Sequence, residues 1–162
     1  LCSLGQNVMI TDYQEYFKLV EYFSEFTKER MALAMGVNNL IQIFDEKYYR
    51  SLSGGILEAF GKLFYRDLKV YMYPYKEEES GEYITSENLK VHPRVKELYK
   101  FFKSNGKLVD IKGFNPEILS IFSRKVLKMI KDDEEGWQEM LPKGVSETIK
   151  EKRLFGFFKK RK

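Results

Sequence analysis

Hydrophobic and polar positions alternate with two different periods along the first half of the chain. Short apolar runs of strand length lie at Asn7–Thr11, Met31–Gly36 and Leu68–Tyr73. Longer segments between them carry apolar residues at helical spacing. Strands that alternate with helices predict an α/β fold with a short, mainly parallel sheet of three strands or slightly more, flanked by helices.

Three helices are expected among these strands. The first covers about residues 12–29, and Thr11 or Asp12 caps its start. Asn38 and Asn39 cap the second helix, and the third follows the break at Ser53-Gly54-Gly55. The spacing of its apolar residues predicts that the third helix buries Ile56, Leu57, Phe60, Leu63 and Phe64.

The second half of the chain has mainly helical spacing. Pro93 fits the first turn of one helix, and Asn105-Gly106 fits its end. Asn115-Pro116 starts another helix, with Ile118, Leu119, Phe122, Val126 and Met129 on its apolar face. We therefore expect an α/β region over residues 1–84, a helical region over 85–156 packed on it, and a basic tail over 157–162.

Composition narrows the class of protein. With 162 residues, 43% hydrophobic and 32% charged, the chain is typical of a globular domain with its own core. It has no apolar run of 18 residues, so no membrane span is expected. The first residue is not Met, which suggests a fragment or a processed chain. The single Cys2 favours an intracellular setting, cytoplasmic or organellar such as mitochondrial.

The net charge of +4 comes from the C-terminal end. Residues 150–162 carry seven basic residues and one acidic residue, whereas the rest of the chain carries 21 basic against 23 acidic. Phenylalanines lie among these cations, and such a composition suits contact with RNA, an anionic membrane or an acidic protein. A solvated tail is the alternative. The candidate contacts are Arg153, Lys159, Lys160, Arg161 and Lys162.

The carboxyl ends of the predicted strands are the expected place for a ligand. In a parallel sheet these ends meet at one edge, and ligands bind in the crevice there. Gly54-Gly55 precedes a helix, whose first amides can hold a phosphate. The alternatives are that the polar residues only cap helices and that the glycines only form a turn. The candidate ligand residues are Asp12, Gly36, Asn38, Asn39, Gly54 and Gly55.

His92 is the only histidine in the sequence. Any motif or metal site that needs two histidines, such as the HxGH nucleotidyl-transfer motif or an HExxH zinc site, is therefore excluded within these residues. Because Pro93 follows it, His92 is expected at the start of a helix. We assign no catalytic residue and no metal ligand, and the residues imply no particular cofactor.

Three stretches together resemble a known family: residues 7–64 with the segment GGILEAFGKLF, residues 89–102 with LKVHPRVKELYKFF, and residues 122–156. The chain is similar to the C-terminal region of larger bacterial and protist proteins that often carry the label nicotinate- or nicotinamide-nucleotide adenylyltransferase. The resemblance implies a link to NAD metabolism. If it also implies nucleotidyl transfer, the catalytic motif lies outside this chain, since HxGH is absent from it.

Two functions are expected from these observations. The first is a non-catalytic accessory or assembly domain of a larger protein, which contacts other subunits or the remainder of its own chain. The second is an adenylyltransferase-like enzyme that binds a nucleotide at the strand ends. The absence of convergent catalytic residues favours the first for this chain, and the resemblance supports the second.

Overall fold

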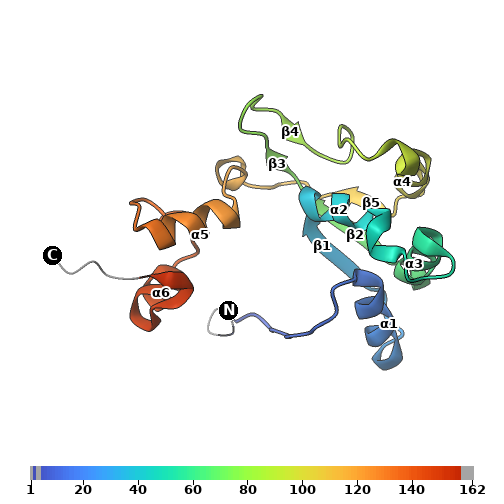
Figure 1. Ribbon diagram of the computed structural model, residues 1–162, viewed down its shortest axis with the longest axis horizontal. Helices are drawn as coiled ribbons and strands as arrows, with labels where there is room; N and C mark the ends of the chain where they lie inside the picture. The colour runs from blue at the N-terminus through green and yellow to red at the C-terminus, as the bar shows by residue number, and fades with distance from the viewer. Residues whose placement is uncertain (1, 3–4, 158–162) are drawn as a thin grey trace. The chain divides into compact units, whose positions relative to one another are not determined.

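A computed structural model describes residue 2 and residues 5–157 of the chain (Figure 1). The chain forms two compact units. The first consists of Leu1–Pro74 together with Ile84–Lys112, and the second consists of Tyr75–Tyr83 together with Gly113–Lys162.

The first unit is built on a three-stranded parallel sheet (Figure 1). Its strands are β1 (Ala32–Gly36), β2 (Lys69–Tyr73) and β5 (Leu108–Asp110), in the order β1-β2-β5. Gly36 is paired with Tyr73, and Met72 is paired with Asp110, so the three strands end at the same edge. The predicted α/β fold with a parallel sheet is therefore confirmed.

The third strand is not the one that the sequence predicted. Asn7–Thr11 forms no strand, and Val8, Met9 and Ile10 are exposed. β5 takes the place instead, because its segment has a hydrogen-bonding partner in β2. The Val70 N–H donates to the Lys107 carbonyl at 2.8 Å, and the Ile111 N–H donates to the Met72 carbonyl at 2.9 Å. An apolar run has strand character only where such a partner exists.

Four α-helices belong to this unit: α1 (Tyr16–Phe26), α2 (Val37–Ile43), α3 (Gly55–Leu63) and α4 (Lys96–Ser104). α1 contacts α3, α2 packs on β1 and β2, and α4 packs on β5. Short 3-10 turns occupy Glu46–Tyr49, Tyr65–Asp67 and Pro93–Val95. The buried apolar residues come from helices, strands and turns alike: Phe17, Val20, Met35, Val37, Leu40, Ile43, Phe44, Tyr49, Ala59, Phe60, Leu63, Leu68, Val70, Met72, Val95, Tyr99, Phe102 and Leu108.

The expected helix starts need correction. α1 begins only at Tyr16, after Glu15 at the N-cap position, and the Thr11 hydroxyl oxygen instead accepts the Tyr13 N–H at 3.1 Å in a local turn. α2 follows β1 without a linker, so Gly36 holds the N-cap position and Asn38 and Asn39 lie inside the helix. The end of α4 is as predicted, since the helix stops before Asn105-Gly106.

The buried face of α3 is narrower than expected. Ala59, Phe60 and Leu63 are buried, as predicted for the last two, but Leu57 is 66% exposed. The elements that pack against α3 cover only one side of its apolar face. The spacing of apolar residues in the sequence does not show how much of such a face other elements will cover.

The second unit has a small hairpin and short helices. β3 (Tyr75–Lys76) pairs with β4 (Tyr83–Ile84), which ends at the boundary with the first unit. A 3-10 turn at Pro116–Ile118 precedes α5 (Ser123–Asp132), α6 (Val145–Lys152) and a last turn at Leu154–Gly156. Val126, Ile130, Trp137 and Ile149 form its core cluster.

The helix expected to start at Asn115-Pro116 is broken in two. Asn115 caps a single 3-10 turn, where its side-chain oxygen accepts the Glu117 N–H at 3.0 Å. The Leu119 carbonyl then accepts the Lys76 N–H of β3 at 3.3 Å instead of a helical amide. A bond to a distant strand therefore ends the turn, and α5 starts afresh at Ser123.

None of the helices in the described part of the chain has the length and apolar character needed to cross a bilayer.

Candidate functional site

The carboxyl edge of the sheet brings three of the predicted ligand residues together. Gly36 ends β1, and Asn38 and Asn39 follow in the first turn of α2, where both are exposed. The space beside the Gly36 Cα is open, with no atom within 4 Å of the place a Cβ would take. Asp110, which is not among the predicted ligand residues, ends β5 at the same edge.

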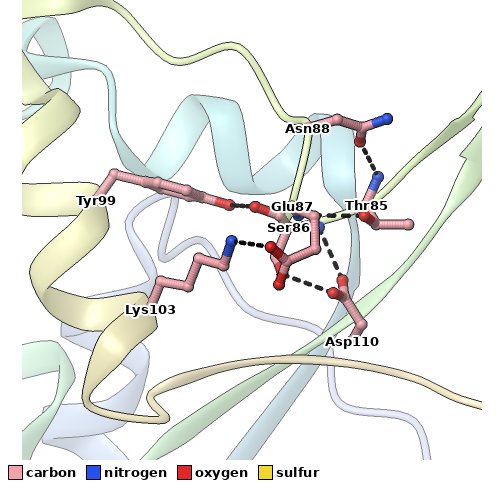
Figure 2. Close-up of polar contacts among 7 residues, drawn as sticks. All are labelled: Thr85, Ser86, Glu87, Asn88, Tyr99, Lys103 and Asp110. Carbon is pink, nitrogen blue, oxygen red and sulfur yellow. Dashed lines mark hydrogen bonds and ion pairs between the residues drawn. The ribbon is translucent and has the colours of Figure 1, made fainter.

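Asp110 is the centre of a polar network at this edge (Figure 2). The Ser86 N–H donates to Asp110 Oδ1 at 2.9 Å, and the Ser86 hydroxyl donates to Asp110 Oδ2 at 2.6 Å. Ser86 is the buried polar residue of the described core. The Tyr99 hydroxyl donates to the Ser86 carbonyl at 2.8 Å. These bonds hold the segment after β4 against both β5 and α4.

Further contacts extend the network to the surface. The Thr85 N–H donates to Asn88 Oδ1 at 2.8 Å, and Lys103 forms an ion pair of 2.6 Å with Glu87. Burial raises the pKa of the Tyr99 hydroxyl above its usual value, and the negative charges of Asp110 and Glu87 add to this. Tyr99 therefore stays a neutral donor. Both oxygens of Asp110 already accept bonds, so the geometry suits an anchor that positions a loop.

The predicted residues Gly54 and Gly55 form a tight turn before α3. The Gly54 N–H donates to Glu58 Oε2 at 2.9 Å, and the Gly55 N–H donates to the Leu52 carbonyl at 3.0 Å. The Gly54 bond, followed by the Lys62 ammonium, lowers the pKa of the Glu58 carboxyl. Gly55 has φ +55°, which favours glycine. The amides that would hold a phosphate are therefore used within the chain.

Asp12 lies apart from these elements, in the exposed segment before α1. It lines a hollow of about 460 Å³ together with Met9, Ile10, Thr11, Tyr13 and Tyr22. The Tyr22 ring packs near Tyr13, Phe23 and Phe26, with ring centroids 5.8, 5.6 and 5.0 Å away. We call this exposed apolar set the α1 surface; it consists of Val8, Met9, Ile10, Tyr13, Tyr22, Phe23 and Phe26.

A cavity of about 340 Å³ brings together cationic side chains that are far apart in the sequence. It is lined by Lys47, Arg50, Arg94 and His92, by the carboxylates Asp45 and Glu46, and by apolar residues that include Phe44. Lys47 pairs with Asp45 at 2.6 Å, and Arg94 pairs with Glu46 at 3.5 Å. The bond to Lys47 lowers the pKa of the Asp45 carboxyl. Such a cavity can accept an anionic group beside an apolar one.

His92 takes the place predicted for it at a helix start. It caps the 3-10 turn that leads into α4, where its Nδ1 accepts the Arg94 N–H at 3.4 Å. Among the predicted tail contacts, Arg153 is exposed and ends α6 in a left-handed conformation with φ 51°. Lys159, Lys160, Arg161 and Lys162 lie outside the described residues.

Comparison with known proteins adds no further assignment. No model of a known family, no curated protein and no solved structure gives a significant match to this chain. The resemblance to the proteins labelled as nucleotide adenylyltransferases therefore stays a prediction.

Proposed function

We propose that the chain is a non-catalytic α/β accessory or assembly domain of a larger protein related to NAD metabolism, and that it binds another protein through the α1 surface. The observation that carries this proposal is the exposure of four clustered aromatic rings on one short helix and the segment before it. Phe26 is 70% exposed and Ile10 is 95% exposed. Contiguous exposed apolar surface of this kind is typical of interaction sites.

The chemistry of the α1 surface fits the centre of a protein interface. Tyr and Phe are enriched at such centres, because they bury a large apolar area and lose few rotatable bonds. The same helix also carries charged residues: Lys18 pairs with Glu15 at 2.9 Å, and Glu21 pairs with Lys62 of α3 at 3.4 Å. An apolar centre with a polar rim is the usual arrangement of a protein interface.

The test is a position-specific photocrosslink in the chain as it exists. A benzophenone side chain replaces Phe26, and extract of the source cells is irradiated with the labelled protein. We expect one dominant protein adduct at this position, and its loss when Tyr22→Ser is added. The matched control carries the same group at Phe101, which is also exposed but lies on α4. Equal labelling at both positions would contradict the proposal.

A second function, nucleotide handling by an adenylyltransferase-like enzyme, is supported by the cationic cavity and the resemblance. Arg50 and Arg94 would contact the phosphates, and Phe44 would contact the base or sugar. Calorimetry with NMN, NAD and ATP tests this function. We expect binding that Arg50→Ala with Arg94→Ala removes, whereas Lys100→Ala, on the exposed face of α4, leaves it intact. No heat with any of the three would end this function for the chain.

A further inference from the structure

An apolar groove runs between α5 and α6 in the second unit. Its volume is about 460 Å³, and it lies apart from the α1 surface in sequence and in unit. Ser123, Leu127 and Ile130 of α5 face it at the spacing of one helical stripe. The remaining lining residues are Ile121, Arg124, Val126, Met140, Leu141, Val145, Ile149 and Phe155.

The groove is the open side of a small core. Val126, Ile130 and Ile149 belong both to the buried cluster and to the lining of the groove. Leu127 is 36% exposed beside them, and Phe155 is 58% exposed. Helices of ten and eight residues depend on packing for their stability. A third helix laid along α5 and α6 would cover these side chains and close the core.

Arg124 lines this groove, and it begins a row of cations along α5. Arg124, Lys128 and Lys131 recur at i, i+4 and i+7 on α5, next to the stripe that faces the groove. Within residues 5–157 none of the three forms an ion pair, whereas Lys125 on the same helix pairs with Glu78 at 3.1 Å. Like charges at this spacing repel one another, and an anionic partner beside them would relieve the repulsion.

The electrostatics of α5 itself do not favour a cation at the position of Arg124. It lies in the first turn of α5, which carries no acidic residue, and the helix dipole disfavours a cation there. Lys128 and Lys131 are nearer the C-terminal end, where the dipole favours them. The position of Arg124 at the mouth of the groove therefore points to an anionic partner.

We propose that this groove binds an acidic amphipathic helix of a partner protein. Apolar side chains at i, i+4 and i+7 of that helix fill the groove, and carboxylates along one flank pair with Arg124, Lys128 and Lys131. A recessed groove fits the ridge of a helix better than it fits a lipid surface, which contacts protruding side chains. The proposal does not depend on the α1 surface.

The test uses the full chain and two fluorescent peptides of about 18 residues, enough for five helical turns. Both peptides carry leucines at i, i+4, i+7 and i+11; one has glutamates on its flanks and the other has lysines. Fluorescence anisotropy measures their binding. We expect saturable binding of the acidic peptide, at least tenfold tighter than that of the basic one, which corresponds to about 1.4 kcal/mol.

Three variants separate the contributions. Arg124→Glu, Lys128→Glu and Lys131→Glu together are expected to reverse the preference between the peptides. Lys125→Glu reverses one charge elsewhere on the same helix and is expected to leave the preference unchanged. Leu127→Glu is expected to remove binding of both peptides, while the fluorescence of Trp137, the single tryptophan, verifies that the unit is folded.

The proposal is overturned if the acidic peptide does not saturate, if both peptides bind equally, or if Leu127→Glu changes nothing. Two other occupants give their own results. Binding to phosphatidylserine vesicles that Leu127→Glu removes, without peptide binding, would assign the groove to a membrane. A dimer in sedimentation that the same substitution dissociates would assign it to a second copy of the chain.

Discussion

The two units of this protein bury their apolar residues by different means. Among the described residues, eighteen buried apolar side chains belong to the unit with the parallel sheet, and five belong to the helical unit. In the first unit, residues of helices, strands and turns together bury these side chains. In the second, a single cluster around Trp137 remains open along one groove. A unit with so few buried groups has little stability of its own.

This difference shows where partners have most to contribute. A unit with a large core is stable without a partner, so that function can rest on exposed residues such as those of the α1 surface. An open core gains stability when something covers it, because binding to the folded state alone stabilises that state. We therefore expect the helical unit to unfold at lower denaturant than the sheet unit.

The largest effect is expected from Phe60→Ala in the sheet unit. The Phe60 ring packs near Phe44, Tyr49, Phe64 and Phe102, with centroids 4.9 to 6.2 Å away. Removing a buried aromatic ring costs about 3–5 kcal/mol of unfolding free energy. Urea unfolding followed by far-UV circular dichroism measures this cost.

The matched control for Phe60→Ala is Leu57→Ala on the same helix, whose side chain is exposed. It is expected to change the free energy by less than about 0.5 kcal/mol. Similar losses from both substitutions would mean that α3 does not bury the face described above.

Ile149→Ala tests the helical unit without removing its fluorescent reporter. Ile149 is buried beside Trp137, and the truncation is expected to cost about 2–5 kcal/mol. The fluorescence transition of Trp137 should move to lower denaturant, while the transition of the sheet unit stays in place. Glu151→Ala on the exposed face of α6 serves as the control. If both transitions move together, the two units unfold as one, and the comparison fails.

Asp110→Asn tests the network that holds the segment after β4. One carboxylate oxygen becomes an amide nitrogen, which cannot accept from Ser86, so a buried donor loses its partner. We expect a loss of about 1–3 kcal/mol, confined to the sheet unit. A double-mutant cycle with Ser86→Ala measures the coupling. Additive losses would show that the two side chains do not interact.

The smallest effect concerns the Gly54–Glu58 turn. The folded pKa of Glu58 is lowered, first by the Gly54 N–H and then by Lys62. A lowered folded pKa gives stability that is present above the unfolded pKa and is lost as the pH falls through the folded pKa. Glu58→Gln should therefore destabilise the chain slightly at neutral pH and not in strong acid. A difference that persists in acid would contradict this assignment.

Part of the fold was predictable because it follows from local pattern. Met31–Gly36 and Leu68–Tyr73 formed strands because short apolar runs between helices bury one face in the core: Met35, Val70 and Met72 are buried, whereas Ala34 and Tyr71 on the other face are exposed. Asn105-Gly106 ended α4, since Gly106 adopts φ +66°. His92 caps the turn before α4 because its side chain accepts the N–H of Arg94, only two residues further along the chain. The candidate site was predicted only where chain continuity joins Gly36 to Asn38 and Asn39.

The rest depended on residues far apart in the sequence. Asn7–Thr11 has a strand composition but no strand beside it, whereas β5 gained one in β2. Ser86 and Asp110 are 24 residues apart, and no spacing in the sequence connects them. The cationic cavity likewise joins residues near 47 with residues near 94. Such pairs form only when the chain closes around its core.

The sequence by itself determined the alternation of strands and helices, the parallel character of the sheet and the basic end of the chain, because periodicity and charge are local properties. Tertiary contacts selected which apolar segment became the third strand and which carboxylate accepts hydrogen bonds from Ser86. They also left one side of the helical unit uncovered, as the groove between α5 and α6. These outcomes depend on which partner each backbone or apolar group contacts, because the free energy of a hydrogen bond or a buried contact depends on both partners.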